Sequence, residues 1–153
     1  MPGTRRLPTR DQLAAWRDFI ETTEALRSRV GGRLHDETGL SPGDYAVMLA
    51  LSEMSEMRSS DLAAHIGWER SRLSHHLGRM ERRGLIQRED CATDNRGAFV
   101  RPTAAGTEAF DAATVPHLKA VRELFVDALT PAQIAAAAEI AAALRAHLDQ
   151  ARP

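Results

Sequence analysis

The chain of 153 residues has little cysteine, few aromatic side chains and no excess of charge of either sign. It contains one cysteine, Cys91, and one tyrosine. A single thiol cannot form an intrachain disulfide, and it excludes a CxxC metal or redox motif. The 20 Lys and Arg residues are offset by 21 Asp and Glu, giving a net charge of -1. A surface that is basic all over is therefore excluded, and any nucleic-acid binding needs a local concentration of positive charge.

Long hydrophobic runs are missing as well. The first residues, MPGTRRLPTRDQ, lack the apolar segment of a secretory signal. The longest apolar stretch, Ala135 to Leu144, is interrupted by Glu139 and is too short to span a bilayer. We therefore expect a cytoplasmic protein with no membrane contact. Its hydrophobic content of 43% and its length suit one compact unit with a buried core.

Positive charge is concentrated in one part of this nearly neutral chain. Eight arginines lie between Arg70 and Arg101, against four acids. Between Glu37 and Glu69 the balance is reversed, because Arg58 alone stands against six acids. This asymmetry indicates a local surface for a polyanion.

Apolar residues at intervals of three and four predict six helices. We expect them over residues 10–36, 42–54, 60–66, 70–83, 104–128 and 131–148. The N-cap residues predicted for the second, third, fifth and sixth of these are Ser41, Ser59, Thr103 and Thr130. Pro116 is expected to bend the fifth helix without ending it.

Two short strands are predicted between the fourth and fifth helices. Residues 85–90 and 98–101 have strand composition, and the segment CATDNRG between them has the Asp, Asn and Gly of a tight connection. A small β-hairpin is the simplest interpretation.

The helix predicted over 70–83 has two different faces. Leu73, Leu77 and Met80 fall on one side and are expected to be buried, with His76 flanking them. The opposite side carries Ser71, Arg72, His75, Arg79 and Arg82. An isolated helix of this kind would be interpreted as a solvated arginine face. Here a short helix precedes it and a hairpin with a cationic tip follows it, which is the arrangement of a helix-turn-helix with a wing.

Four motifs carry a resemblance to a known family. They are the run DLAAHIGWERSRLSHHLGRMERRGLIQRE, the wing DNRG, the segment RPTAAG and the helix start LTPAQ. Together they resemble the MarR family of winged-helix transcription regulators over nearly the whole chain. The resemblance implies a mainly α fold with a small β-hairpin wing. It also implies a winged helix-turn-helix module at 40–103 and a helical dimerisation region formed by 1–39 and 104–153.

The same resemblance implies a function and a set of contact residues. The expected protein is a homodimer that binds double-stranded DNA at a pseudo-palindromic operator, as a ligand-responsive repressor. Arg96 would enter the minor groove at the wing tip, with Asp94 holding it by an ion pair. The residues expected to contact DNA are Arg70, Ser71, Arg72, Ser74, His75, His76, Arg79, Asp94 and Arg96.

The family's ligand pocket would lie near Trp16, Phe19, Tyr45 and Met48. An aromatic or phenolic effector is the expected ligand. Aromatic and methionine side chains at helical spacing are more often plain core, so both interpretations of these residues stay open.

Other functions find less support in the sequence. The six histidines show no helical metal-site spacing with a supporting carboxylate, and Cys91 beside the wing is a weak basis for a redox sensor. No nucleophile, zinc-hydrolase or phosphate-loop motif is found, so no enzyme activity and no cofactor are expected. A winged helix that binds protein instead of DNA remains an alternative. It would have no need of Arg96 or of a cationic helix face.

Overall fold

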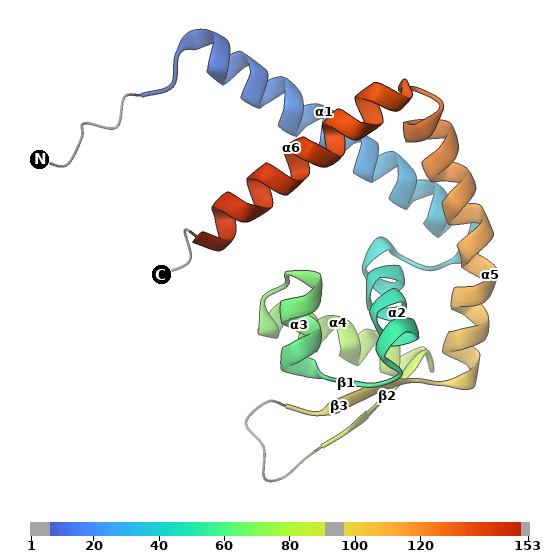
Figure 1. The fold of residues 1–153 in the computed structure, drawn as a ribbon. Coiled ribbons are helices and arrows are strands. Elements are labelled where there is room, and N and C mark those ends of the chain that lie inside the picture. Colours follow the sequence, from blue (N-terminus) through green and yellow to red (C-terminus); the bar gives the residue numbers. More distant parts are fainter. Residues whose placement is uncertain (1–6, 91–96, 151–153) are drawn as a thin grey trace, which may run out of the picture. The chain divides into compact units, whose positions relative to one another are not determined.

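The computed structural model describes residues 7–90 and 97–150, which form two compact units (Figure 1). One unit, here called the central module, comprises residues 31–121. The other, the terminal helical unit, contains the described residues before 31 and after 121. The module is wider than the predicted 40–103, because the last two turns of the first helix and the whole fifth helix pack with it. Within the described part of the chain, no single helix is long and apolar enough to cross a membrane.

The predicted helices are all present, and the fold is mainly helical. In chain order the elements are α1 (Arg10–Thr38), α2 (Pro42–Met54), β1 (Met57–Arg58), α3 (Ser59–Ile66), α4 (Arg70–Arg82), β2 (Ile86–Glu89), β3 (Phe99–Pro102), α5 (Ala104–Val121), the π-helical turn η1 (Arg122–Val126) and α6 (Pro131–Gln150). The fifth helix was predicted to stay α-helical to about residue 128. Instead it widens into η1 after Val121.

Three of the four predicted N-caps are confirmed. Ser41 and Asp44 form a reciprocal capping box at α2, and Thr130 and Gln133 form one at α6. The Thr103 hydroxyl accepts from the backbone N–H of Gly106. The prediction for Ser59 is wrong, because Ser59 is already the first residue of α3 and the N-cap is Arg58. Arg58 pairs with Phe99 of β3, so its backbone is extended, and α3 begins at Ser59, one residue earlier than predicted.

The wing is a three-stranded antiparallel sheet rather than a hairpin alone. β2 and β3 form the predicted hairpin, and β1 adds to the free edge of β3, in the order β1-β3-β2. Val100 of the central strand pairs with both Met57 and Arg88, and its side chain is fully buried. β1 was not predicted because two residues are too few to show strand alternation.

The core of the central module lies between α2, α3, α4 and the sheet. As predicted, the inward face of α4 carries Leu73, Leu77 and Met80, and each is at most 1% exposed. They meet buried residues of the neighbouring elements, including Leu51, Leu62, Ile86 and Val100. Burial of this stripe fixes the rotation of α4 about its own axis, so its opposite face must point to solvent.

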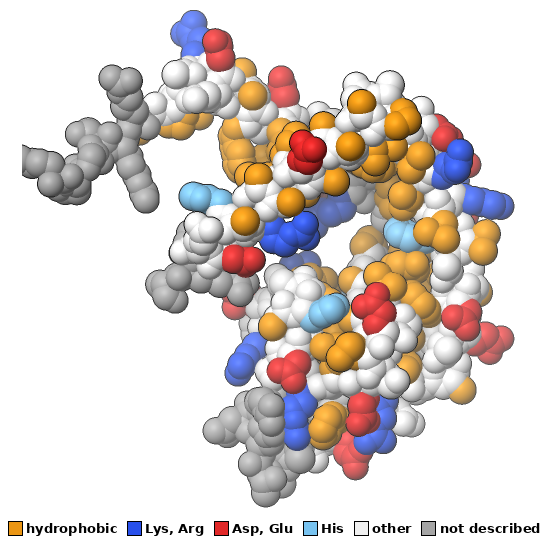
Figure 2. All heavy atoms as spheres, in the orientation of Figure 1, with side chains coloured by type: hydrophobic (Ala, Val, Ile, Leu, Met, Phe, Trp, Pro, Cys, Tyr) orange, Lys and Arg blue, Asp and Glu red, His pale blue; other side chains and the backbone are white. Residues whose placement is uncertain are grey.

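The terminal helical unit leaves much of its apolar surface exposed. No described residue of α6 is buried, and Figure 2 shows hydrophobic side chains gathered along α1 and α6. The large exposed hydrophobic residues on these two helices are Leu13, Trp16, Phe19, Ile20, Ile140, Leu144 and Leu148.

Gly106 gives a direct test of how α5 meets the module. A Cβ at this position would overlap the backbone carbonyl of Leu85, just where the Thr103 N–H also donates to that carbonyl. Gly106→Ala is therefore expected to lower the free energy of unfolding by about 2 kcal/mol, because backbone must shift. Gly32→Ala is the control, since nothing lies within 4 Å of its added Cβ. Gly32→Ala should raise the free energy of unfolding by about 0.5 to 1 kcal/mol, because alanine stabilises the helix α1 more than glycine does. Urea unfolding of both variants makes the comparison, and equal effects would contradict the close approach.

Candidate nucleic-acid interface

The exposed face of α4 brings together most of the predicted DNA contacts. It carries six of the nine predicted residues, all exposed: Arg70, Ser71, Arg72, Ser74, His75 and Arg79. None of these arginines forms an ion pair with a carboxylate of the described residues. Arg70 and Ser74 also line a hollow between α4 and the sheet, together with Arg88. The remaining two outward candidates, Asp94 and Arg96, lie outside the described residues, as does Cys91.

His76 does not belong to this face. Its side chain is only 11% exposed, and its Nε2 lies 3.0 Å from Oδ1 of Asp44. The ring of Trp68 packs nearly perpendicular to the His76 ring, with centroids 5.2 Å apart. This burial argues against the predicted DNA contact of His76, because its ring atoms are turned toward α2 rather than toward solvent.

Asp44, an acid in the first turn of α2, was not among the residues predicted for the site. Its side chain is 1% exposed and contacts Arg83 Nη1 at 2.7 Å as well as His76. Burial by itself would raise its pKa, but contacts with His76, Arg83 and the Ser41 backbone N–H outweigh burial and hold the pKa well below its usual range. Asp44 is thus a buried anion that joins the start of α2 to α4.

Two arginines of the exposed face are held by the rings of Trp68 and His76, and of these two only Trp68 was not predicted as a site residue. The guanidinium of Arg72 lies 4.0 Å from the ring centroid of Trp68, a cation–π contact. Arg79 Nη2 lies 3.1 Å from His76 Nδ1. Trp68 comes just before α4, and His76 lies within α4, three residues before Arg79. Trp68 and Arg72 are four residues apart, and this spacing is a sequence signal from which their contact could have been predicted.

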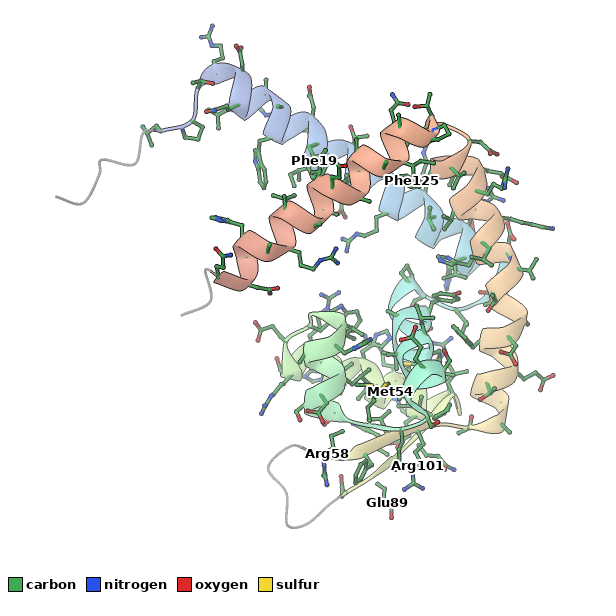
Figure 3. All side chains as sticks on the ribbon, viewed as in Figure 1. Phe19, Met54, Arg58, Glu89, Arg101 and Phe125 are labelled. Carbon is green, nitrogen blue, oxygen red and sulfur yellow. The ribbon has the colours of Figure 1, made fainter. Side chains whose placement is uncertain are left out.

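The arginines of β2 and β3 are compensated by acids. Arg88 pairs with Glu81, and its hydrogen bonds hold the pKa of Glu81 below its ordinary value. Arg101 pairs with both Glu56 and Glu89, and Figure 3 shows Arg101 and Glu89 close together at the sheet. The local excess of arginine seen in the sequence is therefore expressed on α4 more than on the described parts of the strands.

The four residues predicted for a ligand pocket divide between the two units. Tyr45 and Met48 are buried in the central module, whereas Trp16 and Phe19 are exposed on α1. The Tyr45 ring contacts His117, with centroids 4.3 Å apart, and burial lowers the pKa of this histidine. His117 was not predicted here, although its spacing from the buried residues Phe110 and Ala113 places it on the same face of α5. A pocket shared by these residues stays a prediction.

Among residues 7–90 and 97–150, no group of three or more His, Cys, Asp or Glu side chains is placed to hold a metal ion. The geometry of the described site is thus that of a cationic helix face supported by one buried anion. Arginine donors on a rigid, exposed helix suit phosphate oxygens and guanine edges.

The charge of Asp44 gives a pH-dependent prediction. Asp44→Asn is expected to lower the free energy of unfolding at pH 7 by about 2 kcal/mol, because the charged hydrogen bond from Arg83 and the carboxylate's contact with His76 are lost. The folded pKa of Asp44 is depressed, so its stabilisation is present above the ordinary carboxyl pKa of about 3.9 and is lost as the pH falls toward the folded pKa. The difference between wild type and variant should therefore shrink below about pH 4.

Urea titrations at neutral and acid pH measure this difference. Asp61→Asn, at an exposed first-turn position of α3, is the matched control and should show little change at either pH. A deficit for Asp44→Asn that is the same at both pH values would contradict the assigned role of its charge.

Comparison with known proteins gives a consistent result. The sequence pattern of the MarR family matches residues 40–97 of this chain. The transcriptional regulator HosA of Escherichia coli O127:H6 is 34% identical over 112 residues, which are 73% of this chain and 82% of HosA.

Two solved structures from Streptomyces coelicolor are also similar. AbsC, a MarR family transcriptional regulator, is 33% identical with a TM-score of 0.83, over 95% of this chain and 99% of AbsC. Sco3205, a MarR family regulator solved in complex with DNA, is 31% identical with a TM-score of 0.86, over 99% of this chain and 94% of Sco3205.

Proposed function

The chain belongs to the MarR family of DNA-binding transcriptional regulators, and from this premise we propose that it is a homodimeric, ligand-responsive repressor. It acts in the cytoplasm on a pseudo-palindromic operator in double-stranded DNA. The observation that carries the proposal is the exposed face of α4, where three arginines, two serines and a histidine stand opposite a fully buried apolar stripe. A helix of this kind fits the major groove, which admits one α-helix.

The contacts are proposed to divide by chemistry. Arg72 and Arg79 are placed to donate to guanine O6 and N7, the commonest specific contact of arginine in the major groove. Arg70, Ser71, Ser74 and His75 suit phosphate oxygens or base edges. At the wing, we assign Arg96 to the minor groove with Asp94 as its positioning partner, because arginine favours a narrow, negative groove.

The homodimer is proposed from the apolar faces of α1 and α6. These two helices expose large hydrophobic residues that a soluble monomer would rarely leave in one area. Ile140, Leu144 and Leu148 follow one another at intervals of four, so they form a single stripe on α6. Covering this stripe with a second copy would bury it and create the two-fold symmetry that an inverted-repeat operator requires.

We propose that a small molecule relieves repression. An aromatic or phenolic effector is consistent with the aromatic character of Trp16, Phe19 and Tyr45, and with the His117 ring beside Tyr45. Binding of such a ligand would alter DNA affinity only if the ligand favoured one conformation of the dimer over another.

DNA reading is tested by selection from a random duplex pool at two salt concentrations, followed by sequencing. We expect enrichment of an inverted repeat whose half-sites lie about one helical turn apart, roughly 34 to 36 Å. Against the enriched duplex, Arg72→Ala and Arg96→Ala should each weaken binding by about 1 to 3 kcal/mol in fluorescence anisotropy. Lys119→Ala, an exposed cation on α5, is the control and should bind as wild type does. Unselective binding with a flat salt dependence would favour the protein-binding alternative.

The oligomeric state is tested by sedimentation velocity at micromolar concentration. Wild type should sediment as a dimer, and Leu144→Glu as a monomer, because a carboxylate would be buried in the middle of the apolar stripe. Gln150→Glu adds the same charge to α6 away from the stripe and should remain dimeric. A wild-type monomer would rule out the proposed arrangement.

A further inference from the structure

A continuous line of contacts runs from a buried carboxylate to an arginine on the exposed face of α4. Asp44 Oδ1 lies 3.0 Å from His76 Nε2, and His76 Nδ1 lies 3.1 Å from Arg79 Nη2. Asp44 and His76 are buried, whereas Arg79 is exposed. His76 therefore stands between the interior of the module and a side chain proposed to read DNA.

The partners of His76 fix which ring nitrogen carries the proton. A guanidinium can only donate hydrogen bonds, so Nδ1 must be the unprotonated acceptor for Arg79. The single proton of the neutral ring is then on Nε2, which faces the carboxylate of Asp44. A doubly protonated ring would set Nδ1–H directly against the Arg79 cation. The arrangement thus requires the neutral Nε2–H form of His76.

Asp44 is itself held firmly enough to orient the ring. Its Oδ2 accepts from Arg83 Nη1 at 2.7 Å and from the Ser41 backbone N–H at 2.9 Å. The charged groups that face His76 are therefore Asp44 from α2 and Arg79 from α4, with Arg83 of the α4 C-terminus on the far side of the carboxylate.

Packing against α2 restricts the position of the ring. A Cβ at Gly43 would lie 2.8 Å from both His76 Cε1 and an edge carbon of Trp68, so the two rings sit directly on the backbone of α2. Trp68 meets His76 edge to face at 89°, and its own face supports Arg72. The rings of Trp68 and His76 hence act together as the support of both Arg72 and Arg79.

We propose that His76 is a positioning residue for DNA recognition, which in its neutral Nε2–H form holds the Arg79 guanidinium in place for the major groove. This inference rests on the proposed function of α4. A side chain that is already ordered loses less conformational entropy on binding than a free arginine. The gain appears as discrimination between operator and unrelated DNA, because only the operator offers Arg79 its specific partner.

The tautomer is tested without DNA. Two-dimensional ¹⁵N–¹H NMR of the histidine rings at pH 7.5 distinguishes a protonated from an unprotonated ring nitrogen, and His76→Gln identifies the signal of His76. We expect an unprotonated Nδ1 and a protonated Nε2. A proton on Nδ1, in either the other tautomer or the imidazolium, would overturn the proposal even if the protein reads DNA as proposed.

Two substitutions separate the two contacts of the ring. His76→Asn keeps an amide oxygen near the place of Nδ1, so it retains an acceptor for Arg79. His76→Gln keeps an amide nitrogen near Nε2, so it retains the contact with Asp44 and loses that acceptor. We expect His76→Gln to lower discrimination between the selected duplex and a scrambled one about fivefold, and His76→Asn to recover most of this loss.

Each substitution is repeated in an Arg79→Ala background, with thermal melts to establish that the variants are folded. There His76→Gln should have no further effect on discrimination, because the side chain that it positions is absent. Equal losses for Gln and Asn that persist without Arg79 would reduce His76 to a structural role. If wild type selects no sequence at all, the proposed function fails, and the NMR result then stands by itself as a test of the geometry.

Discussion

The contact on which the rest of the DNA-facing geometry depends is the buried carboxylate of Asp44. Placing a charge in the core is costly unless it is paired and hydrogen-bonded, and here each partner comes from a different element. The backbone N–H of Ser41 donates from the start of α2, and the guanidinium of Arg83 donates from the end of α4. Arg83 also donates to the carbonyl of Gly39, directly after α1. The Asp44–Arg83 ion pair therefore links the residue after α1 with α2 and α4.

This tie matters because a recognition helix is useful only in one rotation about its axis. Apolar burial of Leu73, Leu77 and Met80 sets that rotation coarsely, and the Asp44–His76 contact adds a directional constraint. The consequence is a fixed set of outward side chains. Preorganised contacts of this kind raise specificity by avoiding ordering at the moment of binding.

The charge distribution explains how a neutral protein can bind a polyanion. Arg88 and Arg101 of the sheet are compensated by neighbouring glutamates. The arginines on the outer face of α4 have no carboxylate partner among the described residues, and two of them instead contact the rings of Trp68 and His76. Positive charge without an acid partner in the described part of the chain is thereby present on the surface that is proposed to enter the groove.

The parts of this architecture that local sequence determines were predictable. Helix periodicity and capping residues gave the six helices and the inward face of α4, because these signals act within a few residues. β1, with two residues, carries too little pattern and forms only because β3 offers a free edge. The role of Asp44 was not predictable, since Arg83 lies 39 residues away in the sequence. His76 was expected to flank the buried stripe of α4 and was also counted among the DNA contacts. Only the pairing of α2 with α4 shows that the ring turns inward.

The most direct test of this account is a crystal structure of the protein bound to its selected duplex. The account predicts α4 in the major groove, with Arg79 within hydrogen-bond distance of a guanine edge while its guanidinium still contacts His76 Nδ1. A complex in which the duplex lies on another surface, or in which Arg79 leaves His76 to reach the DNA, would contradict it.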